Sequence, residues 1–247
     1  MTTMASKATA AGISLALGAL LGCATSADHL TVDRPLSAAE AAALFEAARG
    51  ASDVAAALAN WRALIRGGVQ KSETLVRGAR AACAVALAQP ADAPGRADLA
   101  REAVAWAEAA LAAGPDDPPA LYAHALALGL LAESSTLAVA PRDVLAAALR
   151  VVAADPAFEH AAGHRMAGLY YVRAPDLYGG DLDRALDHLG RAVALAPDHA
   201  ENHAALAEAR LADDDAAGAR AALDAAAALP HDARVAAWIA ELRHRVR

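Results

Sequence analysis

Aromatic residues and cysteines are scarce in this chain. Aromatic side chains make up 4% of its 247 residues, and there are two cysteines, Cys23 and Cys83. Two cysteines cannot form a disulfide framework. Stretches in which β-branched and polar residues alternate are almost absent, so β-strands have little support. What remains is a chain dominated by alanine, the strongest helix former, and we predict an all-α fold.

A clustered basic surface is missing as well. The chain has 22 lysines and arginines against 29 acidic residues, a formal net charge of -7, and the basic residues are scattered. Binding to nucleic-acid phosphates needs a basic patch. Arg243, Arg245 and Arg247 form one basic group, which we interpret as a solvated helix end. The predicted partners therefore do not include nucleic acid.

Sequence signatures of catalysis are absent too. There is no Gly-x-Ser-x-Gly nucleophile motif, and neither Gly67-Gly68 nor Gly179-Gly180 is directly followed by the Lys-Ser/Thr that a phosphate-binding loop has next to its last glycine. We predict that the protein is not an enzyme and uses no cofactor. A hydrolase whose catalytic residues meet only in the fold is the alternative.

Two histidine pairs have a spacing that metal sites use. His160 and His164 are four residues apart, as are His199 and His203, so each pair lies on one face of a helix. A zinc protease would need a glutamate directly after the first histidine, and both positions hold alanine. We predict no metal site and expect these histidines to line a groove or face solvent, with a metal-binding pair as the alternative.

The first 22 residues have the pattern of an export signal. Lys7 is followed by the apolar run 8–21, which is too short to span a bilayer stably. The run ends in Leu20-Leu21-Gly22-Cys23, which resembles the bacterial lipobox, whose cysteine receives lipid and becomes the new N-terminus. The resemblance implies lipid attachment at Cys23. Cleavage after Ala27, which would release a soluble protein, is the alternative.

Residues 23–36 are expected to form a flexible tether. The stretch has no helical period and holds Pro35 near its end. A flexible chain of this length reaches ~20 Å, so the folded part would lie close to the membrane. Ala24 stands where an aspartate would resemble an inner-membrane retention signal. We therefore expect an exported protein that is lipid-anchored in the periplasm, at the outer membrane.

Four prolines close similar helices and indicate an internal repeat: Pro115, Pro156, Pro197 and Pro230. Their separations are 41, 41 and 33 residues. The tetratricopeptide period is 34 residues, so the last interval matches and the first two contain insertions of about seven residues. The repeat predicts a superhelix of antiparallel helix pairs, a helical-hairpin solenoid that is clear from about residue 96 onwards.

The register of this repeat holds in detail. After the prolines, helices are predicted at 120–131, 159–172, 200–211 and 233–244, and Asp198 and Asp232 are predicted to cap two of them. In this register the sequence resembles tetratricopeptide proteins. Residues expected at close helix crossings lie twelve or five positions before the prolines: Ala103, Val144 and Ala185, and Ala110, Val151, Ala192 and Ala225.

The segment upstream of the clear repeats is predicted to add one or two less regular hairpins. Ser37 and Glu40 form a capping box. Cys83 lies in an apolar stretch and is expected to be a buried, inert thiol. No long polar linker interrupts the chain, so 37–247 is predicted to be one helical-repeat domain. The upstream helices are predicted at 41–49, about 52–65, 72–87 and 96–113.

One insertion carries a closer resemblance. It combines Tyr170-Tyr171 at a helix end, Pro175, Gly179-Gly180-Asp181 and then Ala185. This pattern, over roughly residues 37–211, resembles the T component of TRAP transporters, the TatT family, whose members are periplasmic repeat lipoproteins that accompany the substrate-binding protein. The resemblance implies such a partner and a small organic acid as a further ligand. Locally, the glycines supply positive φ angles and Asp181 caps the next helix.

The binding surface of such a stack is the concave face formed by the first helix of each pair. The register places Tyr122, His164, Glu201, Glu208, Arg234 and Glu241 on that face. Arg173 is predicted at one rim, where the resemblance implies a role with a carboxylate ligand. Three of the four tyrosines lie within nine residues of one another, and packing of the loop against its own helices also explains them. The predicted binding residues are Tyr122, His164, Tyr170, Tyr171, Arg173, Tyr178, Glu201 and Glu208.

Together these patterns predict a membrane-anchored binding or scaffold protein. The first hypothesis is an accessory to the substrate-binding protein of a TRAP-type transporter. The alternative is a general tetratricopeptide lipoprotein in outer-membrane or pilus assembly, with a protein or peptide in its groove.

Overall fold

The structure is a computed structural model that describes residues 36–50, 53–90, 92–134 and 139–246, and the regular secondary structure of these segments is entirely helical. The expected signal, the lipid site at Cys23 and nearly all of the tether lie outside the described residues. Leu36 already belongs to the folded part, because its backbone N–H donates to the Gly67 carbonyl. None of the described helices combines the length and apolar character needed to cross a membrane.

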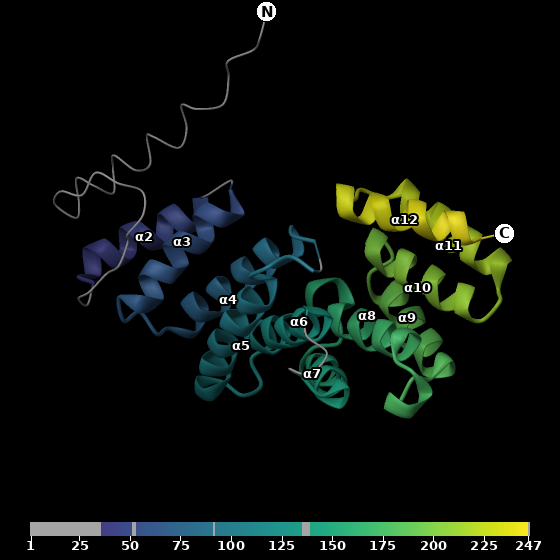
Figure 1. Cartoon of the computed structure of the whole chain (residues 1–247), viewed down its shortest axis with the longest axis horizontal. Coiled ribbons are helices and arrows are strands. Elements are labelled where there is room, and N and C mark those ends of the chain that lie inside the picture. The colour runs from purple at the N-terminus through teal and green to yellow at the C-terminus, as the bar shows by residue number, and fades with distance from the viewer. Residues whose placement is uncertain (1–35, 51–52, 91, 135–138, 247) are drawn as a thin grey trace, which may run out of the picture.

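Successive helices pair in antiparallel hairpins, which confirms the all-α tetratricopeptide-like prediction (Figure 1). The first helix of a pair also contacts the first helix of the next, as α4 does α6, α8 does α10, and α10 does α12. The helices are α2 (Ala38–Gly50), α3 (Val54–Arg66), α4 (Ser72–Leu87), α5 (Arg96–Ala113), α6 (Pro118–Ser134), α7 (Pro141–Ala154), α8 (Phe158–Arg173), α9 (Leu182–Leu195), α10 (Ala200–Ala212), α11 (Ala216–Ala228) and α12 (Ala233–Arg245), with a short 3-10 turn η1 (Asp176–Tyr178) before α9.

The pairs follow a curved path (Figure 1). Helices α6 and α8 lie at the base of the curve, with the N-terminal pairs on one arm and α12 at the end of the other, while α5, α7 and α9 lie on the outer side. We call the side formed by α4, α6, α8, α10 and α12 the inner face. The first helices of the pairs therefore share one surface, as the repeat predicts.

The predicted helix starts are largely confirmed. Ser37 and Glu40 form their capping box, with the Glu40 N–H on Ser37 Oγ at 3.3 Å and the Ser37 N–H on Glu40 Oε2 at 2.8 Å. Asp181 and Asp232 accept from the backbone N–H groups three residues ahead, at 3.0 and 2.9 Å. The prediction for Asp198 is wrong, because the N-cap of α10 is His199, whose side chain makes no capping bond. His199 has the extended backbone of an N-cap residue, so α10 begins at Ala200 and Asp198 lies one position too early to cap it.

Small side chains form most of the core. Fully buried positions predicted from the repeat are Ala103, Ala110, Val151, Ala185 and Ala192. Val144 and Ala225 are only half-buried, since the neighbouring Ala226 takes the contact in the last hairpin. Cys83 is a buried free thiol, as expected, and burial raises its pKa to about 12.

Two glycines of α8 set how closely it packs on its neighbours. A Cβ on Gly163 would lie 2.9 Å from the Val152 backbone nitrogen of α7, and one on Gly168 would lie 2.4 Å from Leu189 Cγ of α9. Real Cβ atoms do not approach other atoms that closely. Only glycine therefore fits at these two positions, where α8 packs against α7 and α9.

Candidate functional site

A group of charged and polar side chains crosses the inner face from α4 to α12. Arg80 of α4 pairs with Glu159 of α8 at 2.6 Å. Arg165 of α8 pairs with Glu201 of α10 at 3.2 Å, and Glu201 also binds Arg234 of α12. We call this group the inner-face network. Its members are Arg80, Tyr122, Glu159, Arg165, His199, Glu201, Asn202 and Arg234.

Asn202 is the buried centre of this network. Its side chain is fully enclosed, and its amide nitrogen lies 3.0 Å from the His160 carbonyl and 3.0 Å from that of Ala192, at the end of α9. Its Oδ1 accepts from Arg165 Nη1 at 2.8 Å. One side chain of α10 thus joins α8 and α9, and satisfies polar groups that burial would otherwise leave unpaired.

The backbone that Asn202 holds is unusual. Glu159, His160 and Ala161 have φ values of 47°, 60° and 59°, a left-handed turn inside the first turns of α8. None of the three is glycine, so each position is strained and persists only where its surroundings hold it. The His160 carbonyl accepts from Asn202 and also from Arg165 Nη1 at 3.3 Å. The turn carries Glu159 to Arg80 and His160 into a stack on His199, with ring centroids 4.4 Å apart.

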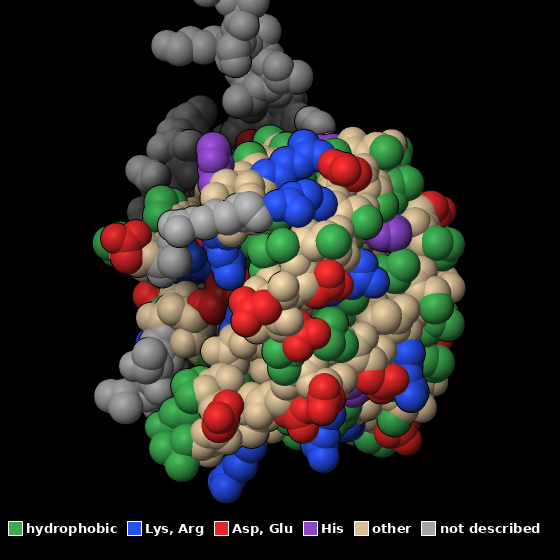
Figure 2. All heavy atoms as spheres, turned by 90° about the vertical axis from the view of Figure 1, so that its right-hand side faces the viewer, with side chains coloured by type: hydrophobic (Ala, Val, Ile, Leu, Met, Phe, Trp, Pro, Cys, Tyr) green, Lys and Arg blue, Asp and Glu red, His purple; other side chains and the backbone are tan. Residues whose placement is uncertain are grey.

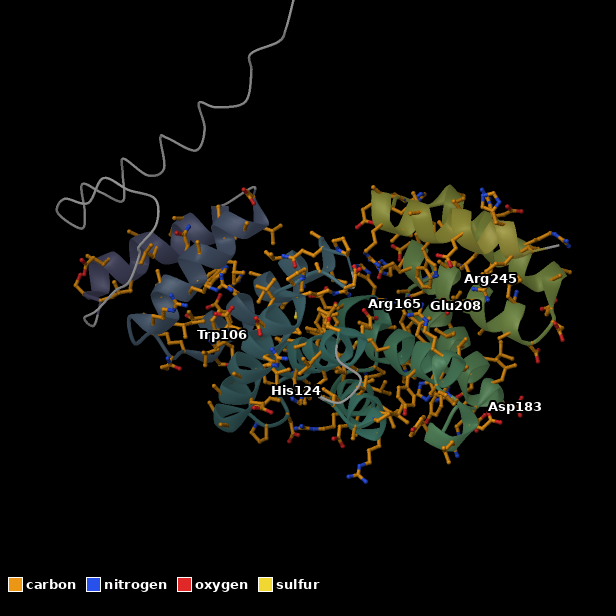
Figure 3. The ribbon with its side chains drawn as sticks, in the orientation of Figure 1. Trp106, His124, Arg165, Asp183, Glu208 and Arg245 are labelled. Carbon is orange, nitrogen blue, oxygen red and sulfur yellow. The ribbon has the colours of Figure 1, made fainter. Side chains whose placement is uncertain are left out.

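A second cluster lies further along the same helices. Arg173 donates to both carboxylate oxygens of Glu208, at 2.8 and 2.9 Å, and Trp238 Nε1 donates to Glu208 at 3.1 Å. The Arg173 guanidinium also lies 5.8 Å from the Trp238 ring centroid. Figure 3 shows Arg165 and Glu208 as neighbours on the side of α8 and α10 that faces α12.

This pairing changes the expectation for Arg173. The hydrogen bonds with Glu208 raise the pKa of Arg173 and hold its guanidinium against a carboxylate of its own chain. The Glu208 side chain is 10% exposed and that of Arg173 49%, so a ligand carboxylate could reach only the guanidinium nitrogen that Glu208 leaves free. Two predicted site residues therefore meet, but they satisfy each other.

The predicted tyrosines fold into the loop between α8 and α9. Tyr170 donates its hydroxyl to the Tyr178 carbonyl at 2.7 Å, and Tyr171 is buried, edge-on to Tyr170. Gly179 has a φ of 86°, as predicted, but the same prediction for Gly180 is wrong. Glycine is needed at Gly180 for space, because a Cβ there would lie 2.0 Å from the Ala174 oxygen. The loop exposes the side chains of Leu177 and Tyr178 at its tip. Packing thus explains Tyr170 and Tyr171, whereas the side chain of Tyr178 is exposed.

His164 lies away from the inner face, contrary to the register prediction. It is buried between α8 and α9, with its Nδ1 3.1 Å from Nδ1 of His188. Ala205, at the equivalent position eight residues after Pro197, is also buried and clusters with Ala185 and Leu189 of α9, so this position of the repeat packs against the second helices rather than lining the inner face. Burial lowers the pKa of both His164 and His188, and the positive charge of Arg191 lowers it further.

Because this histidine pair is buried, we expect acid to destabilise the fold. In the unfolded chain both imidazoles take up protons near pH 6.5, whereas in the folded protein their pKa values are lower. The stability that the pair contributes is therefore fully present above pH 6.5 and is lost as the pH falls below 6.5. The His188→Gln variant keeps a hydrogen-bonding group but does not titrate. We expect its unfolding free energy, measured in urea between pH 7 and pH 5, to fall less steeply than that of the wild type. Parallel curves for the two proteins would contradict this interpretation.

The two spaced histidine pairs do not form common centres. His160 stacks on His199, and His203 Nε2 lies 2.8 Å from the Pro197 carbonyl. Burial lowers the pKa of His199 to about 4 and the charge of Arg165 adds to this, so this imidazole is neutral at pH 7. Within the described part of the chain, no three His, Cys, Asp or Glu side chains gather in a way that could hold a metal ion.

Several residues of the network are missing from the predicted set, namely Arg80, Glu159, Arg165, His199 and Asn202. One sequence signal could have found Arg165, which is the single cation in a run of alanines and glycines in α8. Asn202 carries a weaker one, since asparagine is a poor helix former in a helix otherwise rich in alanine. Nothing in the sequence around Arg80 indicates its role, because its partner Glu159 is 79 positions away.

The surface at the C-terminal end is a weaker candidate for a binding site than the inner-face network. A hollow of about 260 Å³ lies between α11 and α12, lined by Leu223 and Val246 and crossed by the ion pair of Arg243 with Asp224. Figure 2 shows acidic and basic side chains interspersed over this end of the molecule. The inner-face network is therefore the candidate site, because it joins five helices through charged and aromatic groups.

Solved structures similar to this one are tetratricopeptide proteins. TTC0263, a thermophilic TPR protein of Thermus thermophilus, has a TM-score of 0.59 at 20% identity, over 83% of this chain and 95% of that chain. MamA of Desulfovibrio magneticus RS-1 has a TM-score of 0.54 at 19% identity, over 76% and 94%. YrrB, described as a TPR protein with an unusual peptide-binding site, has a TM-score of 0.52 at 17% identity, over 82% and 89%.

The fold therefore places this chain among tetratricopeptide-like helical-repeat proteins. The family model of the TRAP transporter T-component matches residues 42–241, and the chain belongs to that family. The resemblance carried by the insertion between α8 and α9 is thus confirmed. No curated protein matches the chain in sequence.

Proposed function

We propose that this protein is a membrane-anchored accessory of a TRAP-type transporter that holds the transporter's substrate-binding protein. The observation that carries the proposal is the family match over residues 42–241, most of the repeat domain. The T-component family and the repeat fold both favour a binding role over catalysis. A small organic acid, the substrate class that the resemblance implies, is the second proposed ligand.

The inner face supports this role physically. It presents guanidinium, carboxylate and aromatic groups from five helices, and its charged groups, on α4, α8, α10 and α12, are fixed by their own ion pairs. Side chains fixed in this way lose little conformational entropy when a partner binds. The loop between α8 and α9 exposes Leu177 and Tyr178, which would add an apolar contact.

The anchor is part of the proposal. Lipid on Cys23 would hold the repeat domain at the periplasmic side of the outer membrane, and acyl chains contribute ~0.8 kcal/mol for each buried methylene. The mass of the N-terminal peptide of the mature protein tests this. An acylated Cys23 is expected, and an unmodified N-terminus after Ala27 would contradict the anchor.

Co-purification from solubilised envelope tests the function. The full chain, tagged at its C-terminus and expressed in its own host, should bring down a TRAP substrate-binding protein in near-stoichiometric amount. Outer-membrane or pilus assembly proteins in its place would refute the proposal and support the alternative of a general scaffold. A charge-removing variant of the outer layer, Arg142→Gln, is the control, since that side chain is 89% exposed on α7.

A further inference from the structure

The charges of the inner-face network do not balance. Arg80 binds Glu159, while Arg165 and Arg234 share the single carboxylate of Glu201. Three guanidinium groups therefore face two carboxylates, and one positive charge is left over. The neighbouring Asp198 is exposed and its side chain forms none of the ion pairs of the network.

The unmatched charge lies in a partly desolvated place. The Arg165 side chain is 11% exposed, and burial lowers its pKa. Burial also lowers the pKa of Arg234, and repulsion from the nearby Arg165 adds to the effect. Glu201 lies between these two guanidinium groups, but its one negative charge balances only one of them, and an unbalanced charge in a partly buried place is unfavourable.

An aromatic surface borders the same place. Tyr122 of α6 contacts Phe158 of α8 with ring centroids 5.8 Å apart, and the Arg80 guanidinium lies 5.4 Å from the Tyr122 ring. Tyr122 is half-buried, and the charges of Arg165 and Arg80 both act on its hydroxyl. Apolar ring atoms and the excess positive charge therefore lie side by side.

His199 supplies a further polar group. Its Nε2 is buried and makes no hydrogen bond, although Glu201 Oε2 lies 3.5 Å away. Because the imidazole is neutral at pH 7, it can donate one hydrogen bond without adding charge. A buried ring nitrogen without a hydrogen-bond partner is uncommon in folded proteins and needs an explanation.

We propose that Arg80, Arg165 and Arg234, the arginine cluster, bind a small organic anion that carries one carboxylate and an apolar or aromatic body. The ligand carboxylate supplies the negative charge that Glu159 and Glu201 together leave unbalanced, and the apolar body packs on Tyr122. The half-exposed Arg80 and Arg234, on opposite sides of the cluster, are the residues a ligand meets first. The inference gives a site to the organic acid of the proposed function and rests on that function for its biological meaning.

Calorimetric titration of the full chain with phenylacetate tests the site. Phenylacetamide is the matched control, because it has the same ring and no charge. We expect phenylacetate to bind at least tenfold more tightly than the amide at low ionic strength, and this preference to shrink as salt is added. Equal binding of the two compounds, or of phenylacetate and acetate, would overturn the proposal.

Substitutions locate the binding. Arg234→Gln and Arg80→Gln remove half-exposed guanidinium groups, so both variants should fold, and each is expected to weaken phenylacetate binding about tenfold or more. Arg142→Gln, on the outer layer, should bind as the wild type does. Wild-type affinity in the Arg234→Gln variant would place the anion elsewhere and refute the arginine cluster as the site.

The two proposals fail separately. A protein that co-purifies with the substrate-binding protein but does not distinguish phenylacetate from phenylacetamide would refute the anion site alone. A protein that binds phenylacetate through Arg234 and retains no such partner would refute the proposed function and leave the anion site standing.

Discussion

Replacing Asn202 by alanine is expected to lower the free energy of unfolding by about 3 kcal/mol. The change removes the acceptor of Arg165 and the donor to the His160 and Ala192 carbonyls from a side chain that is fully buried. It also releases the left-handed turn at residues 159–161, whose strain the hydrogen bonds to the His160 carbonyl offset. The cost is large because buried polar groups lose their partners while water cannot replace them.

Thermal and urea unfolding measure this effect. For a chain of this size 1 kcal/mol corresponds to about 2–4 °C, so Asn202→Ala should melt roughly 6–12 °C below the wild type. Asp224→Ala is the control, since its carboxylate is 75% exposed and its pair with Arg243 is worth at most about 1 kcal/mol. A loss of stability no larger than that of the control would show that the network does not hold α8, α9 and α10 together.

Replacing Gly168 by valine is expected to cost about 3 kcal/mol, and a change to alanine somewhat less. The new Cβ would lie 2.4 Å from Cγ of Leu189, which is fully buried and has no space into which to move. Helix α8 would have to shift away from α9. Because α8 also contacts α10, the strain would reach the inner face.

Replacing a second glycine of the same hairpin, Gly190, is expected to stabilise the protein instead. A Cβ on Gly190 of α9 has no neighbour within 4 Å, so Gly190→Ala is expected to stabilise the protein by up to about 1 kcal/mol, through helix propensity alone. Urea unfolding of the two variants should therefore give changes of opposite sign. Equal destabilisation by both would mean that the close crossing of α8 and α9 is not what Gly168 provides.

The fold could be predicted from the sequence because the residues that start, end and pack its helices act on their own segment of the chain. Prolines at a regular spacing end the helices, alanines allow them to cross closely, and the Ser37 and Glu40 capping box starts α2. Helices α4 and α5 begin and end where Gly67-Gly68, Pro90 and Gly95 predict. These residues act on their own segment, so the sequence around them is sufficient.

The candidate site could be predicted only in part. The repeat register brings Tyr122, Glu201, Glu208 and Arg234 to the inner face, but it assumes a regular helix. The turn at Glu159, His160 and Ala161 breaks that assumption without a glycine to announce it. His164 faces α9 instead of the inner face, and Ala205 at the equivalent position of the next repeat is buried against α9 as well.

Long-range pairings account for the remainder. Arg173 meets Glu208 across 35 positions, and Arg80 meets Glu159 across a still longer separation. Which arginine finds which carboxylate depends on how the hairpins stack, and no local pattern encodes it. The excess of positive charge at the arginine cluster appears only when these pairs are counted together.

The most direct test of the account is hydrogen–deuterium exchange of the full chain, alone and in complex with the TRAP substrate-binding protein that it brings down. The account predicts that binding slows exchange in α6, α8, α10 and α12, which form the inner face, and leaves α7 and α9 on the outer side unchanged. Slower exchange confined to α7 and α9, with the inner helices unaffected, would contradict it.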